Sequence, residues 1–524
     1  MSFLFFISLI SQVLSDKPNI VIFMADDLGY NDLGSFGSIT VSTPNIDTLA
    51  YEGLKLTQFY STAPLCSGSR AALLTGRLPQ RTGAYTNKSY PDDLRYRVFY
   101  PTSEYGVPTS ELTLAYFLKN SGYYTKMIGK WHLGHHGVLP TQHGFDSWLG
   151  LPYSHEEGFP GPNPEGWVFP PVPLMRDTDI IEQPVNLTAL TPKYNNEAIN
   201  FIENHATNNF SQPFLLYVAY EQPHVPLFTS AGWNNVSRRG LFGDCVAEMD
   251  HSIGLIMNKL TEVGYGDNTL VIFSSDNGAW INPSSGASLD NTVTYSFDGG
   301  SNAPNRGGKG STWEGGSHVP AIIWGMGIKD HSTCMSPITN MDILPTIADI
   351  VGFSLPNDRT YDGVSVKKYI FNTNECNNNN PNNRTNDPHI FTYYWRADKL
   401  YAMRYYQYKA HWITRNGFGE KPPIYHSPPI LFNLEWDPAE SVELNTTKGS
   451  EYYEILQIME NEYIRATNDV LNDLGIPGFN YQEWRYVPCC NDGFNYTEAE
   501  EYWKEGNREL AIWDECICNP PFKK

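Results

Sequence analysis

The chain has 524 residues, of which 41% are hydrophobic and 14% aromatic, so it contains ample material for a buried core and does not have the composition of a disordered chain. Its 36 Lys and Arg residues against 57 Asp and Glu residues give a formal net charge of −21, which argues against the basic face that a nucleic-acid-binding protein needs. The length favours two to four domains, or one large α/β core with a smaller addition.

Residues 1–15 are predicted to be a cleaved signal peptide. The apolar run at residues 3–10 is too short to span a bilayer, and Val13 and Ser15 satisfy the small-residue rule for cleavage before Asp16. A buried first strand is the alternative interpretation. No later apolar stretch reaches the roughly 20 residues of a membrane helix, so we expect no transmembrane segment.

Several Asn-X-Ser/Thr sequons agree with export. They begin at Asn87, Asn186, Asn209, Asn235, Asn383, Asn445 and Asn495. This pattern is the acceptor for N-glycosylation in exported proteins. Together with the signal peptide it predicts the secretory pathway, with the lysosome or the extracellular space as the destination.

Strands and helices are predicted to alternate along the first two thirds of the chain. Short apolar runs at 17–24, 215–220, 269–274 and 321–324 are typical of strands buried on both faces. Residues 111–121 and 244–260 have apolar residues at helical spacing. Such alternation predicts a mostly parallel sheet covered by helices on both faces, with the ligand site beyond the carboxyl ends of the strands.

The remaining third is predicted to form a smaller α+β domain. An Asn-rich surface loop at 372–388 separates the larger first domain, 16–371, from this domain, 389–524. Residues 390–414 and 428–434 have the composition of hairpin strands, and 451–474 that of a long helix.

The eight cysteines fall into different chemical settings. Cys489, Cys490, Cys516 and Cys518 predict a pair of disulfides, with a zinc site as the alternative. Cys245 lies in a helical pattern and is expected to be an unpaired core thiol. Cys66 lies apart, in a Gly-, Ser- and Arg-containing segment that does not resemble a disulfide position.

Polar side chains follow three of the predicted strands. Asp26 and Asp27 follow the first, Asp276 and Asn277 follow the third, and His224 lies just beyond the second. Adjacent carboxylates repel one another unless a cation binds them, and oxygen ligands favour calcium or magnesium over zinc. These strand ends predict one metal site.

Cys66 is expected to open a helix, with Arg70 one turn later. A helix amino terminus and a nearby cation both favour a reactive cysteine. The residues alone allow a cysteine nucleophile of the phosphatase kind or a structural thiol.

The segment at 64–77 resembles the signature of the formylglycine-dependent type I sulfatase family, Cys-x-Pro-Ser-Arg followed by Leu-Thr-Gly-Arg. Further boxes at 26–30, 129–134, 275–278 and 308–316 resemble the same family in the same order. Leu151 to His155 and the terminal cysteines are most similar to arylsulfatase A and its close relatives. The resemblance implies an alkaline-phosphatase-like α/β fold, with a large mixed, mostly parallel sheet between helices and a smaller C-terminal α+β domain.

The resemblance also implies the roles of individual residues. Cys66 would be converted to formylglycine by the formylglycine-generating enzyme during export, and the hydrated aldehyde would attack sulfur. The implied ligands of one Ca²⁺ are Asp26, Asp27, Cys66, Asp276 and Asn277. The implied catalytic residues are Cys66, Arg70, Lys130, His132, His224 and Lys309, and the implied substrate contacts are Lys130, Ser154, His224 and Lys309. In this scheme His224 and Lys309 protonate the leaving alcohol, and His132 takes the second hydroxyl proton of residue 66.

The chain departs from the family pattern at Gly68, where the family usually has Pro. Gly adds backbone entropy to the short extended peptide that the modifying enzyme recognises. The resemblance implies calcium-dependent hydrolysis of sulfate monoesters as the function. If Gly68 prevents the conversion of Cys66, the alternative is a catalytically impaired sulfatase-like secreted matrix or binding protein. A phosphomonoesterase or phosphodiesterase of the same fold is a further alternative. The substrate could be a sulfated small molecule, glycolipid or glycan, and a homo-oligomer is compatible with the sequence.

Overall fold

A large mixed sheet forms the centre of the computed structural model, which describes residues 17–87, 97–158, 171–281, 293–294, 299–376, 387–417, 422–491, 493–497 and 516. Its strands are β1 (Asn19–Ala25), β2 (Leu54–Tyr60), β3 (Tyr124–Gly129), β4 (Ser147–Gly150), β5 (Leu174–Arg176), β6 (Asp179–Glu182), β7 (Phe214–Ala219), β9 (Thr269–Ser275), β11 (His318–Gly325), β12 (Ser332–Cys334) and β13 (Ile338–Thr339). They are ordered β12-β2-β11-β9-β1-β7-β3-β4-β5-β6, with β13 beside β2. The run from β9 to β4 is parallel, whereas β11, β5 and β6 are antiparallel to their neighbours. The expected mixed, mostly parallel sheet is confirmed.

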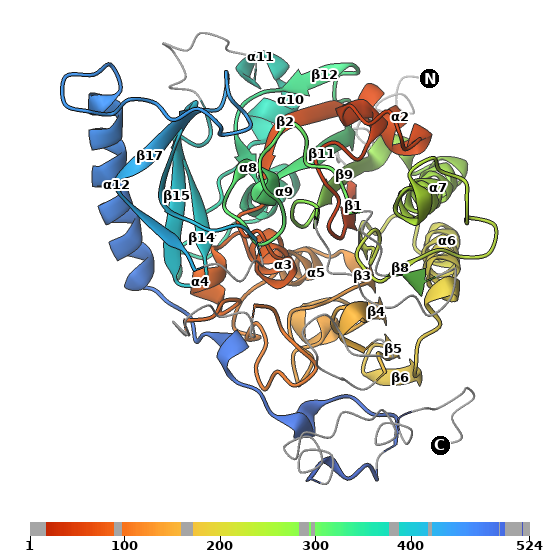
Figure 1. The fold of residues 1–524 in the computed structure, drawn as a ribbon. Helices are drawn as coiled ribbons and strands as arrows, with labels where there is room; N and C mark the ends of the chain where they lie inside the picture. The colour runs from red at the N-terminus through yellow and green to blue at the C-terminus, as the bar shows by residue number, and fades with distance from the viewer. Residues whose placement is uncertain are drawn as a thin grey trace, which may run out of the picture.

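Helices cover both faces of this sheet (Figure 1). Successive side chains of a strand point to opposite faces, so in β1 Ile20 and Ile22 enter one core while Val21 and Phe23 enter the other. The helices packed on the first core are α3 (Cys66–Thr75), α5 (Leu114–Asn120), α9 (Ile343–Val351) and α10 (Lys367–Phe371). Those on the second are α2 (Pro44–Tyr51), α6 (Leu190–Asn208) and α7 (Gly240–Glu262).

The helices predicted at 111–121 and 244–260 correspond to α5 and α7. Helix α5 begins three residues later than expected, because Thr113 caps it by accepting a hydrogen bond from the backbone N–H of Tyr116 at 3.2 Å. Shorter elements complete this part of the chain: α4 (Pro79–Thr82), α8 (Glu314–Ser317), α11 (Thr373–Cys376), and the strand pair β8 (Leu227–Phe228) and β10 (Val293–Thr294).

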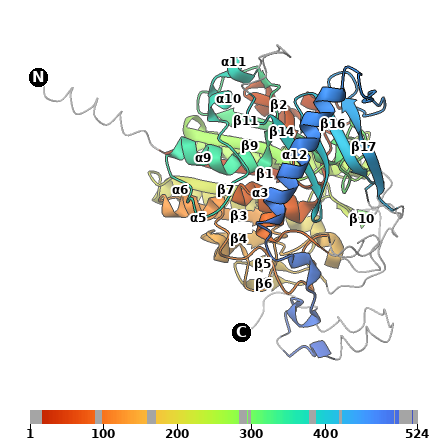
Figure 2. The same ribbon diagram turned by 90° about the vertical axis from the view of Figure 1, so that its left-hand side faces the viewer.

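A second, antiparallel sheet forms the smaller C-terminal domain (Figure 2). It is ordered β14 (Phe391–Arg396), β15 (Lys399–Tyr405), β16 (Tyr408–Thr414) and β17 (Ile424–Asn433). Helix α12 (Tyr453–Leu471) packs on it through Leu456 and Met459, which meet Met403 and Leu431 of the sheet. The predicted α+β composition of this domain is therefore confirmed.

Disulfides join parts of the chain that lie far apart in sequence. Cys489 pairs with Cys516, and Cys490 is also disulfide-bonded, so the zinc alternative for this cluster is wrong. Cys334 pairs with Cys376 across 42 residues, a bridge that the sequence did not predict. Cys245 is a buried free thiol, as expected.

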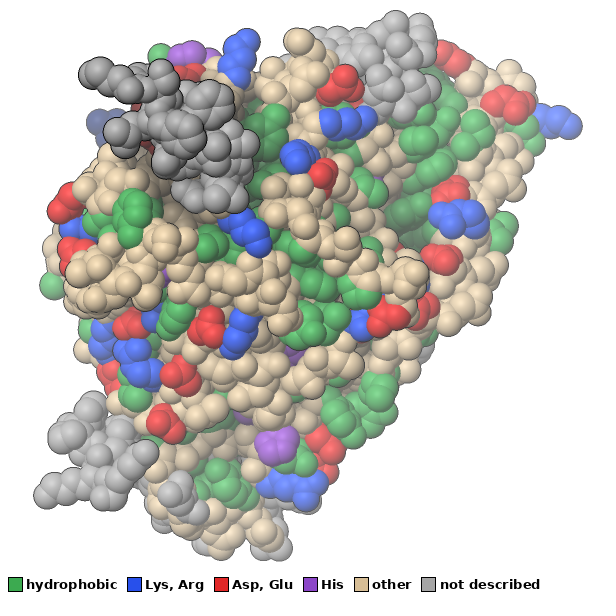
Figure 3. Space-filling view, turned by 180° about the vertical axis from the view of Figure 1, so that it is seen from behind, with side chains coloured by type: hydrophobic (Ala, Val, Ile, Leu, Met, Phe, Trp, Pro, Cys, Tyr) green, Lys and Arg blue, Asp and Glu red, His purple; other side chains and the backbone are tan. Residues whose placement is uncertain are grey.

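Some of the sequence predictions fall on parts of the chain outside the described residues. These are the signal peptide, most of the Asn-rich loop, Asn383 and Cys518. Within the described ranges, no helix has both the length and the apolar character needed to cross a membrane. On the back face of the molecule, acidic and basic side chains of the described residues are interspersed, so no continuous basic surface forms there (Figure 3).

Candidate active site

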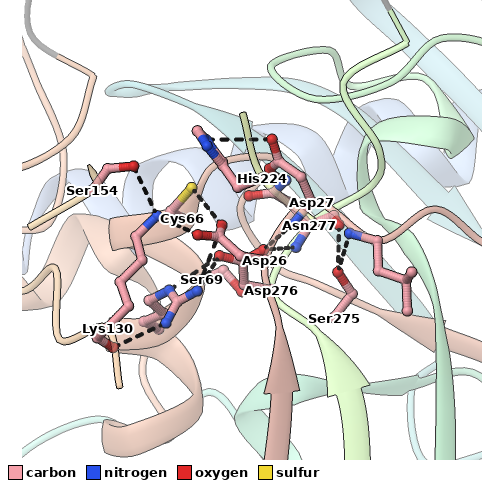
Figure 4. A network of polar contacts seen from close by, with 12 residues as sticks. Asp26, Asp27, Cys66, Ser69, Lys130, Ser154, His224, Ser275, Asp276 and Asn277 are labelled. Carbon is pink, nitrogen blue, oxygen red and sulfur yellow. Dashed lines mark hydrogen bonds and ion pairs between the residues drawn. The ribbon is translucent and has the colours of Figure 1, made fainter. Parts of the chain in front are cut away.

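Four neighbouring strands of the main sheet deliver their carboxyl-terminal residues to one place (Figure 4). The polar residues that follow these strands are Asp276 and Asn277 after β9, Asp26 and Asp27 after β1, His224 after β7 and Lys130 after β3. All of them are buried. Carboxyl ends of parallel strands meet at one edge of a sheet, and the structure places the strand ends predicted from the sequence together at this edge.

Two of the carboxylates at this edge, Asp27 and Asp276, are held by hydrogen bonds from backbone N–H groups and from the Asn277 side chain. Asp276 Oδ1 accepts hydrogen bonds from the backbone N–H groups of Asp27 at 3.1 Å and Asn277 at 2.9 Å. The Asn277 side chain donates to Asp27 Oδ1 at 2.7 Å, while its own Oδ1 is buried and has no hydrogen-bond partner among the described residues. Potential ligand atoms of Asp26, Asp27, Cys66 and His224 lie within 4.8 Å of one another. An unpaired amide oxygen beside clustered carboxylates fits a hard divalent cation.

Each of the three carboxylates is paired with a basic side chain. The closest pairs are Arg70 with Asp276 at 2.8 Å, Lys130 with Asp26 at 2.5 Å and Lys309 with Asp27 at 2.9 Å. Burial nevertheless raises the pKa of Asp27 to about 6 and that of Asp276 to about 7. Three formal positive charges cancel three negative ones here, so a divalent cation would leave the site positive within a chain of formal net charge −21. An anionic substrate requires such a local excess of positive charge.

Cys66 is the first residue of α3 and is buried and unpaired. Its Sγ lies 3.5 Å from Asp26 Oδ1, within the group of charged side chains (Figure 4). Burial raises the pKa of the thiol well above its usual range, although Lys130 and Lys309 oppose this effect. Unmodified Cys66 is therefore a protonated thiol at neutral pH.

His224 and Lys309 are close enough to share one proton, with Lys309 Nζ 2.6 Å from His224 Nε2. Burial, assisted by the Lys309 charge, holds the pKa of His224 well below its usual range. Burial opposes the charged form of Lys309, but Asp27 raises its pKa well above the usual range. The imidazole is therefore neutral, Nε2 accepts from the ammonium, and Nδ1 donates to the carbonyl of Val225.

Ser154 and His132 border Lys130. Ser154 is buried, and its Oγ lies 3.3 Å from Lys130 Nζ. The buried ring of His132 has no hydrogen-bond partner among the described residues, and the nearest carboxylate oxygen is Glu157 Oε1, 3.6 Å from Nε2. Burial and the charge of Lys130 hold the pKa of His132 well below its usual range, so the ring is neutral with a free nitrogen lone pair but is a weaker base than an exposed histidine.

Gly68 is packed tightly inside α3. A Cβ at this position would lie 2.9 Å from Ala63 Cβ and 3.4 Å from Pro79 Cγ. The neighbouring backbone would therefore have to move to accept the Pro that the sulfatase signature usually has. Gly68, the residue that departs from the signature, therefore fits the close packing around the start of α3.

The loop that carries Lys309, residues 306–316, is held by the C-terminal domain, which the sequence did not indicate. The Arg396 guanidinium of β14 donates to the carbonyl of Gly310, next to Lys309. The backbone N–H of Gly310 in turn donates to the carbonyl of Pro64 at 2.8 Å, two residues before Cys66. The Arg396 guanidinium thus helps to fix the segment that carries Lys309 and, through Gly310, the segment that carries Cys66.

A buried ion cluster fixes the other end of the same loop. Glu314 of α8 accepts hydrogen bonds from Lys409 Nζ, Tyr60 OH and Tyr394 OH, each at 2.8 Å. Glu440 accepts from the backbone N–H of Glu314 at 2.7 Å and lies 3.3 Å from Lys409 Nζ. Burial opposes the ionisation of Glu314, but Lys409, together with His318 and Arg404, lowers its pKa to about 2.

An alkaline-phosphatase-like sheet with carboxylates and cations gathered at its strand ends is typical of hydrolases that act on anionic esters. Comparison with known proteins narrows this class. The sequence profile described as Sulfatase matches residues 18–353, and the one described as the C-terminal region of aryl-sulfatase matches residues 387–498. The chain therefore belongs to the sulfatase family, which confirms the resemblance inferred from its motifs.

Curated relatives and solved structures agree with this assignment. The chain is 35% identical to arylsulfatase G of Rattus norvegicus over 92% of its own length and 93% of the relative. It is 36% identical to N-acetylgalactosamine-6-sulfatase of Homo sapiens, over 84% of this chain and 83% of the relative. The structure of the PsFucS1 sulfatase from Pseudoalteromonas sp. superposes with a TM-score of 0.72 at 26% identity, over 89% of this chain and 93% of that one. The chain is a sulfuric ester hydrolase.

Proposed function

We propose that this protein hydrolyses sulfate monoesters through a formylglycine made from Cys66, with one calcium ion. The strongest support is the position of Cys66, buried at the start of α3 and in contact with Asp26 among paired carboxylates and cations. Its raised thiol pKa makes unmodified Cys66 a poor nucleophile. Formylglycine supplies a hydrated aldehyde, and so an oxygen nucleophile, at the same position.

Asp26, Asp27, Asp276 and Asn277 would hold the calcium ion, with residue 66 as a further ligand. The buried, unpaired Oδ1 of Asn277 supports this assignment. Calcium would supply Lewis acidity and the positive charge that a sulfate ester requires.

The basic side chains would divide the remaining work between the sulfate and the leaving alcohol. Lys130 and Ser154, 3.3 Å apart, bind sulfate oxygens, and Arg70 holds Asp276 and the start of α3 in place. Lys309 Nζ carries the proton shared with His224 and donates it to the leaving oxygen.

His132 would supply the base in this scheme. Its ring is neutral, and it would accept a hydroxyl proton from the hydrated form of residue 66. The net reaction consumes one water molecule and yields an alcohol and sulfate.

The substrate would be a sulfated small molecule, glycolipid or glycan, since the similar proteins are named for aryl, N-acetylgalactosamine 6- and steryl sulfates. The protein would enter the secretory pathway and reach the lysosome or the extracellular space. Disulfides and exposed sequons support this location. The exposed sequon asparagines are Asn87, Asn186, Asn209, Asn235, Asn445 and Asn495.

The second candidate function is a sulfatase-like secreted matrix or binding protein without turnover. Gly68 favours it, because the modifying enzyme would meet a looser peptide than the usual Pro-containing one. Such a protein would keep the metal ligands and retain a thiol at position 66.

Mass spectrometry of the tryptic peptide Leu56–Arg70 from secreted protein separates the two candidates. An aldehyde that forms a hydrazone, together with aryl sulfate turnover that is lost on Cys66→Ala, is the expected result. A thiol that is alkylated in every molecule would refute the hydrolase mechanism. Turnover of the matching aryl phosphate in preference to the sulfate would instead indicate a phosphomonoesterase.

A further inference from the structure

An aromatic side chain lies beside the two groups that would handle the leaving alcohol. Trp280 follows the metal-ligand segment of β9 and is half-buried. Lys309 Nζ lies 5.3 Å from the centre of a Trp280 ring, and the imidazole of His224 lies 6.2 Å from it. Trp280 therefore presents apolar surface next to the atoms proposed to protonate the leaving oxygen.

A carboxylate reaches the same place from another segment. Glu156 Oε1 lies 3.8 Å from His224 Nε2, and its side chain is 22% exposed, so a bound molecule can still reach it. Ser154, two residues earlier, contacts Lys130 on the other side of Cys66 (Figure 4). The short segment 154–156 therefore extends from the sulfate position to the leaving-group side.

On the basis of the proposed sulfatase function, we propose that Trp280 and Glu156 form a subsite for a neutral sugar ring carrying a single sulfate. The C–H face of a pyranose packs on an aromatic ring, and its hydroxyl groups donate to a carboxylate, which has only acceptor atoms when ionised. An apolar leaving group such as a sterol would offer no hydroxyl group to the carboxylate.

Charge selects against polyanionic sugars at this subsite. A second sulfate or a uronate next to Glu156 would place like charges together, which disfavours a polyanion at this position. The substrate that fits both features carries one sulfate and no other charge.

Steady-state kinetics of the full-length secreted protein test this subsite with three esters: N-acetylgalactosamine 6-sulfate, a sulfated disaccharide containing a uronate, and 4-methylumbelliferyl sulfate. The wild type should prefer the neutral sugar to the uronate disaccharide by about tenfold or more in kcat/KM. Trp280→Ala should raise KM for the neutral sugar about tenfold, and Trp280→Phe should retain most of the affinity. Glu156→Gln should reduce the kcat/KM preference for the neutral sugar over the uronate disaccharide, because the amide is uncharged and still accepts hydrogen bonds.

Glu156→Ala should lower kcat/KM for the neutral sugar relative to the aryl sulfate by about tenfold. If the wild type turns over aryl sulfate but prefers the uronate disaccharide, or if the substrate ratios of all variants stay within threefold of wild type, the subsite alone is refuted.

Calorimetric binding of N-acetylgalactosamine 6-sulfate gives a readout that does not depend on turnover. If no ester is hydrolysed yet this sugar binds, and binds more weakly to Trp280→Ala, the proposed function fails and the subsite stands. Absence of both turnover and binding overturns both proposals.

Discussion

Replacing Lys409 with Met should destabilise the protein strongly, although the residue lies outside the catalytic sheet. The Lys409 side chain is fully buried, with its ammonium 2.8 Å from Glu314 and 3.3 Å from Glu440. Met retains most of the aliphatic stem but removes the ammonium that lies between the two carboxylates. Removing one partner of a buried ion pair costs about 3–5 kcal/mol, because the remaining charge stays buried and uncompensated.

The same substitution should lower kcat, because Glu314 anchors the loop that carries Lys309. A displacement of about 1 Å at a catalytic group can reduce the rate about 100-fold. Urea unfolding and aryl sulfate turnover, measured well below the unfolding transition, give the two readouts. Lys193→Met is the matched control: its partner is Glu182 and its side chain is 33% exposed, so it should cost less than about 1 kcal/mol.

The pH dependence of Lys409→Met sharpens this test. Without Lys409 the pKa of Glu314 should rise above the unfolded value of about 4.5, so the variant should regain stability as the pH falls through that raised pKa, while the wild type loses the stability that the lowered pKa supplies only as the pH falls from about 4.5 to about 2. A double variant with Glu314→Gln should recover part of the loss at neutral pH, because the unpaired charge is gone. Unfolding of Lys409→Met within 1 kcal/mol of wild type would refute the role of the ion cluster, and unchanged kcat would refute its role in positioning Lys309.

Three further predictions follow from other parts of the structure. Asn277→Ala should weaken calcium binding and reduce the rise in melting temperature on calcium addition to the chelator-treated protein; an unchanged rise would exclude Asn277 as a ligand. Burial raises the pKa of Glu221 to about 8 although Tyr194 donates to it, so the folded state binds its proton more tightly than the unfolded chain, and stability should fall as the pH rises from about 4.5 to 8. In Glu221→Gln the urea concentration at the unfolding midpoint should fall less steeply over this pH range. An unchanged dependence of the midpoint on pH would contradict a protonated Glu221. Replacing Cys334 and Cys376 together with Ala opens a 42-residue loop and should cost about 4 kcal/mol in the free energy of unfolding, whereas a loss below 1 kcal/mol would show that the bridge contributes little.

Local patterns predicted much of the fold and of the candidate site. The apolar run at 17–24 forms β1, and its abrupt end in Asp26 and Asp27 marks the edge of the sheet where Asp276 also lies. These predictions succeeded because the burial of a strand and the position of its end can both be recognised from consecutive residues. The start of α5 was predicted too early, because the capping role of Thr113 was not recognised.

Contacts between distant segments were not predicted. Nothing in the spacing of Cys334 and Cys376 marks them as partners, and disulfide connectivity cannot be deduced from sequence alone. Glu314 and Lys409 lie 95 residues apart and meet only because the C-terminal sheet packs against the loop of Lys309. Trp280 and Glu156 likewise reach His224 from separate segments.

The family, the strands and the residues at the strand ends could be predicted from the amino-acid sequence, because they follow from side-chain type and order along the chain. The distant side chains that surround the leaving-group side of the site, and the contacts that hold Lys309 in place, became visible only in the folded chain. Those contacts depend on how the two sheets pack, which is set by the sum of many weak, non-local contacts and by no single motif.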